Sequence, residues 1–168
     1  MDAWKTAKEM LRDVTPLKRD CGRLCGARCC RSLEGEETGM LLFPGEEDDY
    51  EDAPGWRILP AGQELLMICP GTCDRENRPL ACRLFPLIPI LQDGKIHVRT
   101  DERARAVCPL ARAGKQGMDP AFAETVRQAG EILCRDGAQK AFLSRLAAEQ
   151  EDLKALREKL GVPARRKN

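Results

Sequence analysis

The sequence predicts a mainly α protein with a small β-hairpin, an α+β class in which helices flank a loop-rich central region. Three observations predict it: helical periodicity near both ends, an Asp-Gly turn between two alternating runs, and eight of eleven prolines between Pro44 and Pro109. A length of 168 residues is typical of one domain, so we expect 1–168 to form a single domain.

The composition excludes several classes of partner. Hydrophobic residues make up 42% of the chain and charged residues 33%, which is enough to bury a core without lipid. The 28 basic and 27 acidic side chains nearly cancel, so no net field attracts nucleic acid. The N-terminus lacks a signal-peptide pattern, and no apolar stretch approaches the ~18 residues of a membrane span. We therefore expect a cytoplasmic protein that binds neither nucleic acid nor a membrane.

The first helix is expected over residues 3–14, where apolar residues from Trp4 to Val14 recur at helical spacing and Pro16 follows. A β-hairpin is expected where the runs 87–91 and 95–100 flank the turn formed by Asp93 and Gly94. Pro89 has no N–H to donate, so its strand should be an edge strand or carry a bulge.

Two helices are expected over residues 119–160, beginning at the capping pair Asp119-Pro120 and broken at Asp136-Gly137. Each carries one apolar stripe that should pack against the rest of the protein. The first stripe is Phe122, Val126, Ala129 and Leu133, and the second is Phe142, Leu146, Leu153, Leu156 and Leu160.

Cysteine usage is the most unusual feature of the chain, which has nine cysteines and one histidine. Eight of the cysteines lie between Cys21 and Cys108, in the region rich in proline and loops. An odd count and a reducing cytosol disfavour a disulfide framework. Such a region buries too little apolar surface to offset its chain entropy, and bound metal can supply the missing stabilisation. We therefore expect 21–110 to be a metal-stapled, metal-binding core.

The first cysteine cluster has a spacing that suits chelation. Cys21, Cys25 and Cys29 are four residues apart, which on a helical turn brings side chains close enough for their sulfurs to converge on one ion. The adjacent Cys29 and Cys30 should point to opposite faces if the chain is extended. This pair could serve two sites, or provide one ligand and one packed thiol.

The second cluster comprises Cys69, Cys73 and Cys82, and Cys108 follows further along the chain. Eight cysteines allow two sites of four thiolates, or one such site with spare thiols. Arginines accompany both clusters, and a nearby cation offsets thiolate charge, although each could equally be an ordinary surface residue. These arginines are Arg23, Arg28, Arg31, Arg78 and Arg83.

The runs CGRLCGARCCR and RPLACRLFPL, with a later CPL, resemble the YkgJ-like cysteine-cluster family of zinc- or iron-chelating domains. The resemblance spans residues 21 to about 110. The sequence departs from the family motif in two ways. The spacers between the first cysteines are one residue longer than in the motif, and Arg75 or Glu76 stands where the family usually has a tyrosine. Flagellin lysine N-methylases share the cluster, but they are much longer, and we do not transfer their activity. The resemblance points to Cys21, Cys25, Cys29, Cys30, Cys73, Arg78, Pro79, Cys82, Arg83, Phe85 and Pro86.

The ligand hypothesis has two tiers. Cys25, Cys29, Cys73 and Cys82 are the preferred ligands, and Cys21, Cys30, Cys69 and Cys108 form a second site or alternates. Arg78 and Arg83 are expected beside the cofactor, where they would balance its charge. All-sulfur ligation suits both zinc and an iron–sulfur cluster, and the scattered ligands, vicinal cysteines and arginines slightly favour the cluster.

Three functions are compatible with this pattern. The metal centre could support redox-linked modification of a partner protein, or zinc could be purely structural in an adaptor whose C-terminal helices bind a protein partner. A third class, metal storage or delivery, has no positive support. The chain has no phosphate-binding loop, dinucleotide fingerprint, zincin motif or serine-hydrolase motif, so it offers no direct evidence of catalysis.

The remaining candidates have ordinary explanations. His97 is expected at the surface or half buried, with ligation in a Cys₃His site as the alternative. Cys134 is expected to be a core or surface thiol outside the clusters. The acidic run 46–52 is expected to be a solvated loop, with cation or basic-partner binding as the alternative. The FPGEE segment could bring Glu46 or Glu47 close to the sulfurs.

Overall fold

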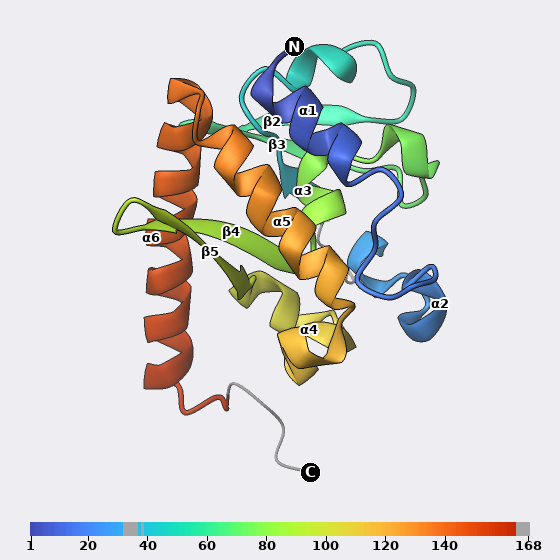
Figure 1. Ribbon diagram of the computed structural model, residues 1–168. Coiled ribbons are helices and arrows are strands. Elements are labelled where there is room, and N and C mark those ends of the chain that lie inside the picture. Colours follow the sequence, from blue (N-terminus) through green and yellow to red (C-terminus); the bar gives the residue numbers. More distant parts are fainter. Residues whose placement is uncertain (32–36, 38, 164–168) are drawn as a thin grey trace.

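The computed structural model describes residues 1–31, 37 and 39–163. It is 48% helical and about 16% strand, which confirms the mixed α+β class. Helices α5 (Pro120–Leu133) and α6 (Gly137–Lys159) pack against a hairpin of β4 (Leu87–Gln92) and β5 (Lys95–Thr100), and α1 (Ala3–Met10) packs beside α5 (Figure 1). This packing forms the main hydrophobic core.

The N-terminal helix is shorter than expected. It buries Trp4 and Ala7 as its spacing predicts, but it ends at Met10 and does not extend to Val14. Leu11 caps it and is only 1% exposed, so the chain leaves the helix while still anchored in the core. The carbonyl of Pro16 then accepts a hydrogen bond from the amide of Asp119 at 2.8 Å.

The predicted hairpin is confirmed, and it has the expected register. Gln92 pairs with Lys95, which leaves a two-residue loop of Asp93 at φ +51° and Gly94 at φ +72°. Positive φ at both positions is the type I′ geometry that Asp-Gly favours. Among the described residues this sheet has two strands, so Pro89 lies in an edge strand as expected.

The two C-terminal helices are also confirmed, together with the break between them. Asp119 accepts the amide of Ala121, and Asp136 accepts the amide of Gln139, so each helix begins with a side-chain cap. The apolar stripe of α5 is fully buried, as expected: Phe122, Val126, Ala129 and Leu133.

The apolar stripe predicted along α6 is buried only in the first half of the helix. Phe142 and Leu146 are buried, but Leu156 is 52% exposed and Leu160 is 69% exposed. The last turns extend past the core, so these leucines have no partner layer to pack against. The preceding turns are held by polar contacts as well as by packing, because Gln150 bonds to the segment at Asp101.

The central region contains a second sheet that the sequence analysis missed. Its order is β1-β3-β2, and all neighbouring strands are antiparallel. The missed signal is Gly62, which turns the chain at φ +65° between two apolar runs. Leu42, Tyr50 and Met67 form a small separate core on this sheet. The strands are β1 (Gly39–Leu41), β2 (Arg57–Ala61) and β3 (Glu64–Ile68).

Short helices carry or adjoin most of the cysteines. The α-helical ones are α2 (Gly22–Cys25), α3 (Leu80–Leu84) and α4 (Pro109–Ala113). The described part of the chain also has five 3₁₀ turns: Arg28–Cys30, Glu47–Asp49, Arg75–Asn77, Glu102–Ala106 and Lys115–Gly117.

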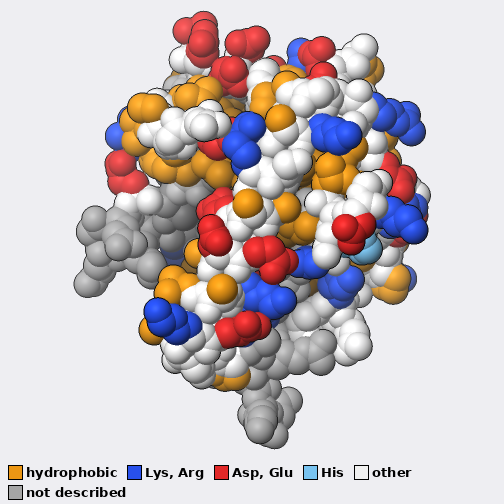
Figure 2. Space-filling model, turned by 90° about the vertical axis from the view of Figure 1, so that its left-hand side faces the viewer, with side chains coloured by type: hydrophobic (Ala, Val, Ile, Leu, Met, Phe, Trp, Pro, Cys, Tyr) orange, Lys and Arg blue, Asp and Glu red, His pale blue; other side chains and the backbone are white. Residues whose placement is uncertain are grey.

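The surface shows no large region of one charge on the face seen in Figure 2, where Lys and Arg alternate with Asp and Glu. None of the helices in the described ranges combines the length and apolar character needed to cross a bilayer.

We predict that Gly130→Ala destabilises the protein by about 1–2 kcal/mol. A Cβ at Gly130 would lie 2.7 Å from Cβ of Pro89 and 2.9 Å from Cγ2 of Ile96, and such overpacking costs about 1–3 kcal/mol against a helix-propensity gain of at most ~1 kcal/mol. Urea denaturation measures the free energy of unfolding. Gly137→Ala is the control, because a Cβ there meets nothing within 4 Å. Equal stabilities for the two variants would contradict the close packing of α5 on the hairpin.

Candidate metal centre

All nine cysteines are free thiols, and eight of them divide into two neighbouring groups. We call the first group the cavity cysteines: Cys21, Cys25, Cys29 and Cys108. We call the second group the Arg78 cysteines: Cys30, Cys69, Cys73 and Cys82.

The cavity cysteines surround one hollow of about 30 Å³. Three of them come from the segment around α2, which lies at the periphery of the molecule in Figure 1, and the fourth precedes α4. Two water-sized atoms would fill this volume. The rest of the wall is mainly apolar and includes Leu24, Phe85, Pro86, Val107, Pro109 and Leu110.

Local backbone geometry explains how these four thiols meet. Cys21 caps α2 and Cys25 is its last residue, so the two lie one helical turn apart, as their spacing predicts. Gly26 ends the helix at φ +63°, a conformation that glycine adopts without strain. Cys108 precedes Pro109 at the start of α4, from the other side of the hollow.

The electrostatics of this group show that its sulfurs influence one another. Burial raises the pKa of Cys21, and the neighbouring Cys108 and Cys25 raise it further. Burial also raises the pKa of Cys108, while the backbone amides of Ala111 and Leu110 oppose that shift. Mutual repulsion of this kind keeps the thiols protonated, and a bound cation would reverse it.

Three of the Arg78 cysteines come from the loop after β3 and from α3, and Cys30 comes from the 3₁₀ turn after α2. Burial raises the pKa of Cys82, and Cys30, Cys73 and Cys69 raise it further in that order, so the four thiols are near enough to interact. Burial likewise raises the pKa of Cys69.

Polar groups of the chain already support these sulfurs. The amide of Gly71 donates to Sγ of Cys69 at 3.3 Å, and Gly71 reaches this position at φ +92°. Amide-to-sulfur hydrogen bonds of this type hold and tune metal-bound thiolates. Arg78 donates to Cys73. Burial lowers the pKa of Arg78, but this bond and the nearby Cys73 and Cys30 outweigh it and leave the pKa raised.

The vicinal pair joins the two groups. Cys29 and Cys30 lie in a 3₁₀ turn, and their Sγ atoms are 3.9 Å apart. The sequence analysis assumed an extended chain, in which these two side chains would point in opposite directions. In the 3₁₀ turn, with three residues per turn, neighbouring side chains differ in direction by about a third of a turn. Cys29 therefore lines the hollow while Cys30 belongs to the Arg78 cysteines.

In neither group are the sulfurs already arranged to coordinate a metal ion. Within residues 1–31, 37 and 39–163, no three Cys, His, Asp or Glu side chains form a group shaped to hold a metal ion. Ligation by either group requires its four sulfurs to approach one another around a bound ion.

The structure distributes the predicted ligands differently from the preferred quartet. Cys25 and Cys29 line the hollow, whereas Cys73 and Cys82 lie in the other group. The second-tier residues complete each set, with Cys21 and Cys108 in the first and Cys30 and Cys69 in the second. The four preferred ligands therefore combine two cysteines from each group, because spacing in the sequence does not show which segments meet in space.

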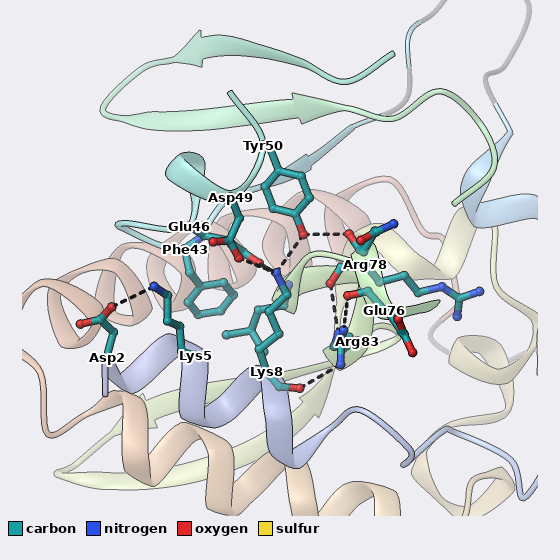
Figure 3. A network of polar contacts seen from close by, with 12 residues as sticks. Asp2, Lys5, Lys8, Phe43, Glu46, Asp49, Tyr50, Glu76, Arg78 and Arg83 are labelled. Atoms are coloured by element: carbon teal, nitrogen blue, oxygen red, sulfur yellow. Dashed lines mark hydrogen bonds and ion pairs between the residues drawn. The ribbon is translucent and has the colours of Figure 1, made fainter. Parts of the chain in front are cut away.

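The two predicted arginine neighbours differ. Arg78 contacts the sulfurs, as described above. Arg83 is 9% exposed, and its guanidinium donates to the backbone carbonyls of Lys8, Arg75, Glu76 and Arg78 (Figure 3). These bonds cross-link α1 to the loop before α3, so Arg83 contributes by fixing the position of α3 and its cysteine.

Glu46, in the FPGEE segment, lies against the first residue of α3. It is completely buried, accepts the amide of Leu80 at 2.7 Å, and pairs with Nζ of Lys8 at 3.4 Å (Figure 3). Burial raises the pKa of Glu46, and Lys8 and the amides only partly offset this. Its charge also raises the pKa of Cys82. Glu46 thus satisfies the first amide of α3 and connects the cysteine-bearing helix to the core.

The other sequence candidates lie elsewhere. His97 is exposed on β5, and Cys134 caps the end of α5, half buried and outside both groups. Asp48, Glu51 and Asp52 of the acidic run are exposed as expected, but the prediction of a solvated loop is wrong for Glu46 and Tyr50, which are buried. Arg23 and Arg28 are exposed as well.

Comparisons of the chain with protein-family models, with curated proteins and with solved structures found no match. The resemblance to the YkgJ-like family therefore stays a prediction from the cysteine motifs.

We predict that Cys30 is the most reactive thiol of the reduced, chelator-treated protein. The hydrogen bond with Cys29 and the charge of Arg78 together lower the pKa of Cys30 to about 6, against the effect of burial. At pH 6 Cys30 should react with iodoacetamide roughly tenfold faster than an ordinary cysteine, after allowing for the lower nucleophilicity of a low-pKa thiolate. The rate should rise with pH up to about 6 and level off above 7.

Fragment-ion mass spectrometry distinguishes alkylation of Cys30 from that of Cys29, and Cys134 serves as an internal reference. Arg78→Gln should slow the reaction several-fold at pH 6, because it removes the cation that favours the thiolate. A rate for Cys30 that rises only around pH 8 to 9 would contradict the proposed arrangement.

Proposed function

We propose that this protein binds metal through cysteine thiolates, with the cavity cysteines as the ligands of one centre. The observation that carries the proposal is that four thiols from two distant segments surround a single small hollow. Four thiolates at about 2.3 Å complete the tetrahedral coordination of zinc. The reducing cytosol, where we expect the protein to reside, keeps such thiols free to bind metal.

The packing of the cysteine-bearing segment supports the same proposal. None of the side chains from Leu17 to Arg31 is buried, although this segment carries four of the cysteines. Such a segment gains little from the hydrophobic effect, so another interaction must offset its loss of chain entropy. Metal ligation does so, because its binding free energy contributes directly to folding.

The size of the hollow favours zinc over an iron–sulfur cluster. A volume of about 30 Å³ matches one ion, whereas a cluster of several iron and sulfide atoms would extend beyond the hollow. A closed site with four protein ligands has no free position for a substrate, so this centre would be structural. In that role it fixes α2 against the start of α4.

An iron–sulfur cluster is the second candidate. It is favoured by Arg78, whose hydrogen bond to Cys73 would offset the negative charge of a thiolate-ligated cluster. A bound iron–sulfur cluster would favour a function in redox-linked modification of a partner protein. Bound zinc would favour a structural role in an adaptor that binds a protein partner.

The first test is the metal content of protein purified without oxygen, measured as zinc, iron and acid-labile sulfide per chain. We expect wild-type protein and Cys134→Ser to carry the same bound metal, and Cys25→Ser to lose one centre. Cys25 and Cys134 are both half buried, but only Cys25 lines the hollow. Equal metal content in all three proteins would remove the cavity cysteines from the ligand set, and metal-free wild-type protein would overturn the proposal.

The second test is removal of the metal by a chelator, followed by hydrogen exchange. Amides of residues 21–31 should exchange much faster, because the ligands hold a segment that has no buried side chain. Amides of α5 and the first half of α6 should keep their protection, since apolar packing holds them. A uniform change over the whole chain, or none at residues 21–31, would contradict a local stabilising role.

A further inference from the structure

We propose that the protein holds a second thiolate-ligated metal centre at the Arg78 cysteines and that Cys29 and Cys30 serve different centres. This inference rests on the proposed function of the cavity cysteines and extends it. It assigns Cys30, Cys69, Cys73 and Cys82 to one centre, with Arg78 beside it.

Position separates the second group from the first. Cys69 and Cys73 follow β3, and Cys82 lies in the middle of α3, so three of the four thiols come from a region that contributes no cysteine to the hollow. The loop at Gly71 brings them to the vicinal pair: a Cβ there would lie 3.7 Å from the carbonyl oxygen of Cys30. The fourth thiol of this group, Cys30, comes from the segment around α2.

The chain already contributes polar groups suited to thiolates at this point. The amide of Gly71 bonds to Sγ of Cys69, and the guanidinium of Arg78 bonds to Cys73. Four thiolates around a divalent ion leave a net charge of about −2, and one adjacent arginine halves it. The cavity cysteines have a different supporting set, since the amides of Leu110 and Ala111 face Cys108. Two differently supported groups of four indicate two centres rather than one centre with spare thiols.

The vicinal pair can divide between the centres without strain. Tetrahedral ligation at about 2.3 Å places sulfurs of one site slightly under 4 Å apart, so the 3.9 Å between the two Sγ atoms alone does not assign them. The lining of the hollow does, because it includes Cys29 with Cys21 and Cys25 but not Cys30. Cys82 interacts with both members of the pair, so the two groups adjoin at this point. The two centres would therefore be close neighbours, bridged by one peptide unit.

Native mass spectrometry of protein purified without oxygen counts the centres in each variant. The sharpest comparison is Cys25→Ser combined with Cys29→Ser against Cys25→Ser combined with Cys30→Ser. Both proteins lack two thiols, and they differ only in which member of the vicinal pair is replaced. We expect the first to keep one centre and the second to keep none. Starting from Cys73→Ser the order reverses, since adding Cys30→Ser leaves one centre and adding Cys29→Ser leaves none.

The outcomes separate this inference from the proposed function. Two centres in wild-type protein, with the reciprocal pattern above, support the inference. A single centre that Cys25→Ser removes and Cys73→Ser spares overturns the inference and leaves the proposed function standing. Wild-type protein without metal overturns both. If wild-type protein holds a single centre that every variant except Cys134→Ser loses, both groups belong to one larger site. That result would also overturn the assignment of the cysteines to two centres.

A second measurement does not depend on the folding of any variant. Wild-type protein is stripped of metal, reloaded with cadmium-113 and studied by nuclear magnetic resonance. Two resonances in the region of four-sulfur coordination are expected, one from each group. One such resonance, or a position typical of oxygen or nitrogen ligands, would overturn the second centre.

Discussion

The attachment of residues 17–31 to the rest of the chain is the constraint on which the central region depends. Elsewhere apolar packing is sufficient, since α1, α5, α6 and the β4–β5 hairpin share one buried core. In this segment no side chain is buried, and only Leu17 and Cys21 pack partly against that core. Beyond Leu17, the group of this segment that packs against the core is the thiol-bearing Cys21. The stability of the segment is therefore linked to whatever its thiols bind.

The regular elements position the sulfurs through a few polar anchors. Arg83 and Glu46 fix α3, and with it Cys82, against α1 and the loop that follows β1. On the other side, Gln150 of α6 bonds to Asp101, and the 3₁₀ turn that follows leads directly to Cys108. Helix α6 thus supports the segment that carries Cys108, and α1 supports the helix that carries Cys82. Breaking a buried anchor such as Glu46 would leave amides or a cation without partners and would cost several kcal/mol, so these residues are structural supports of the site.

Local signals in the sequence were sufficient for the elements that depend on them. Asp93-Gly94 determined the hairpin, and the capping pairs at Asp119 and Asp136 determined where α5 and α6 begin. Leu156 and Leu160 follow the same periodicity as buried leucines yet are exposed, because burial depends on whether another layer lies opposite. The second sheet was missed because its strands are short and separated by prolines and loops. For the site, spacing identified the eight cysteines, whereas their division into two groups depends on contacts between segments up to 87 residues apart, such as Cys21 and Cys108, which no local pattern encodes.

X-ray absorption at the edge of the bound metal tests the central claim most directly, because it reports the ligand atoms whatever the metal is. The account predicts a first shell of sulfur alone at about 2.3 Å, with four sulfurs for zinc and an additional iron–iron distance for a cluster. A first shell dominated by nitrogen or oxygen would contradict it. So would protein in which no metal is bound and all nine thiols titrate freely.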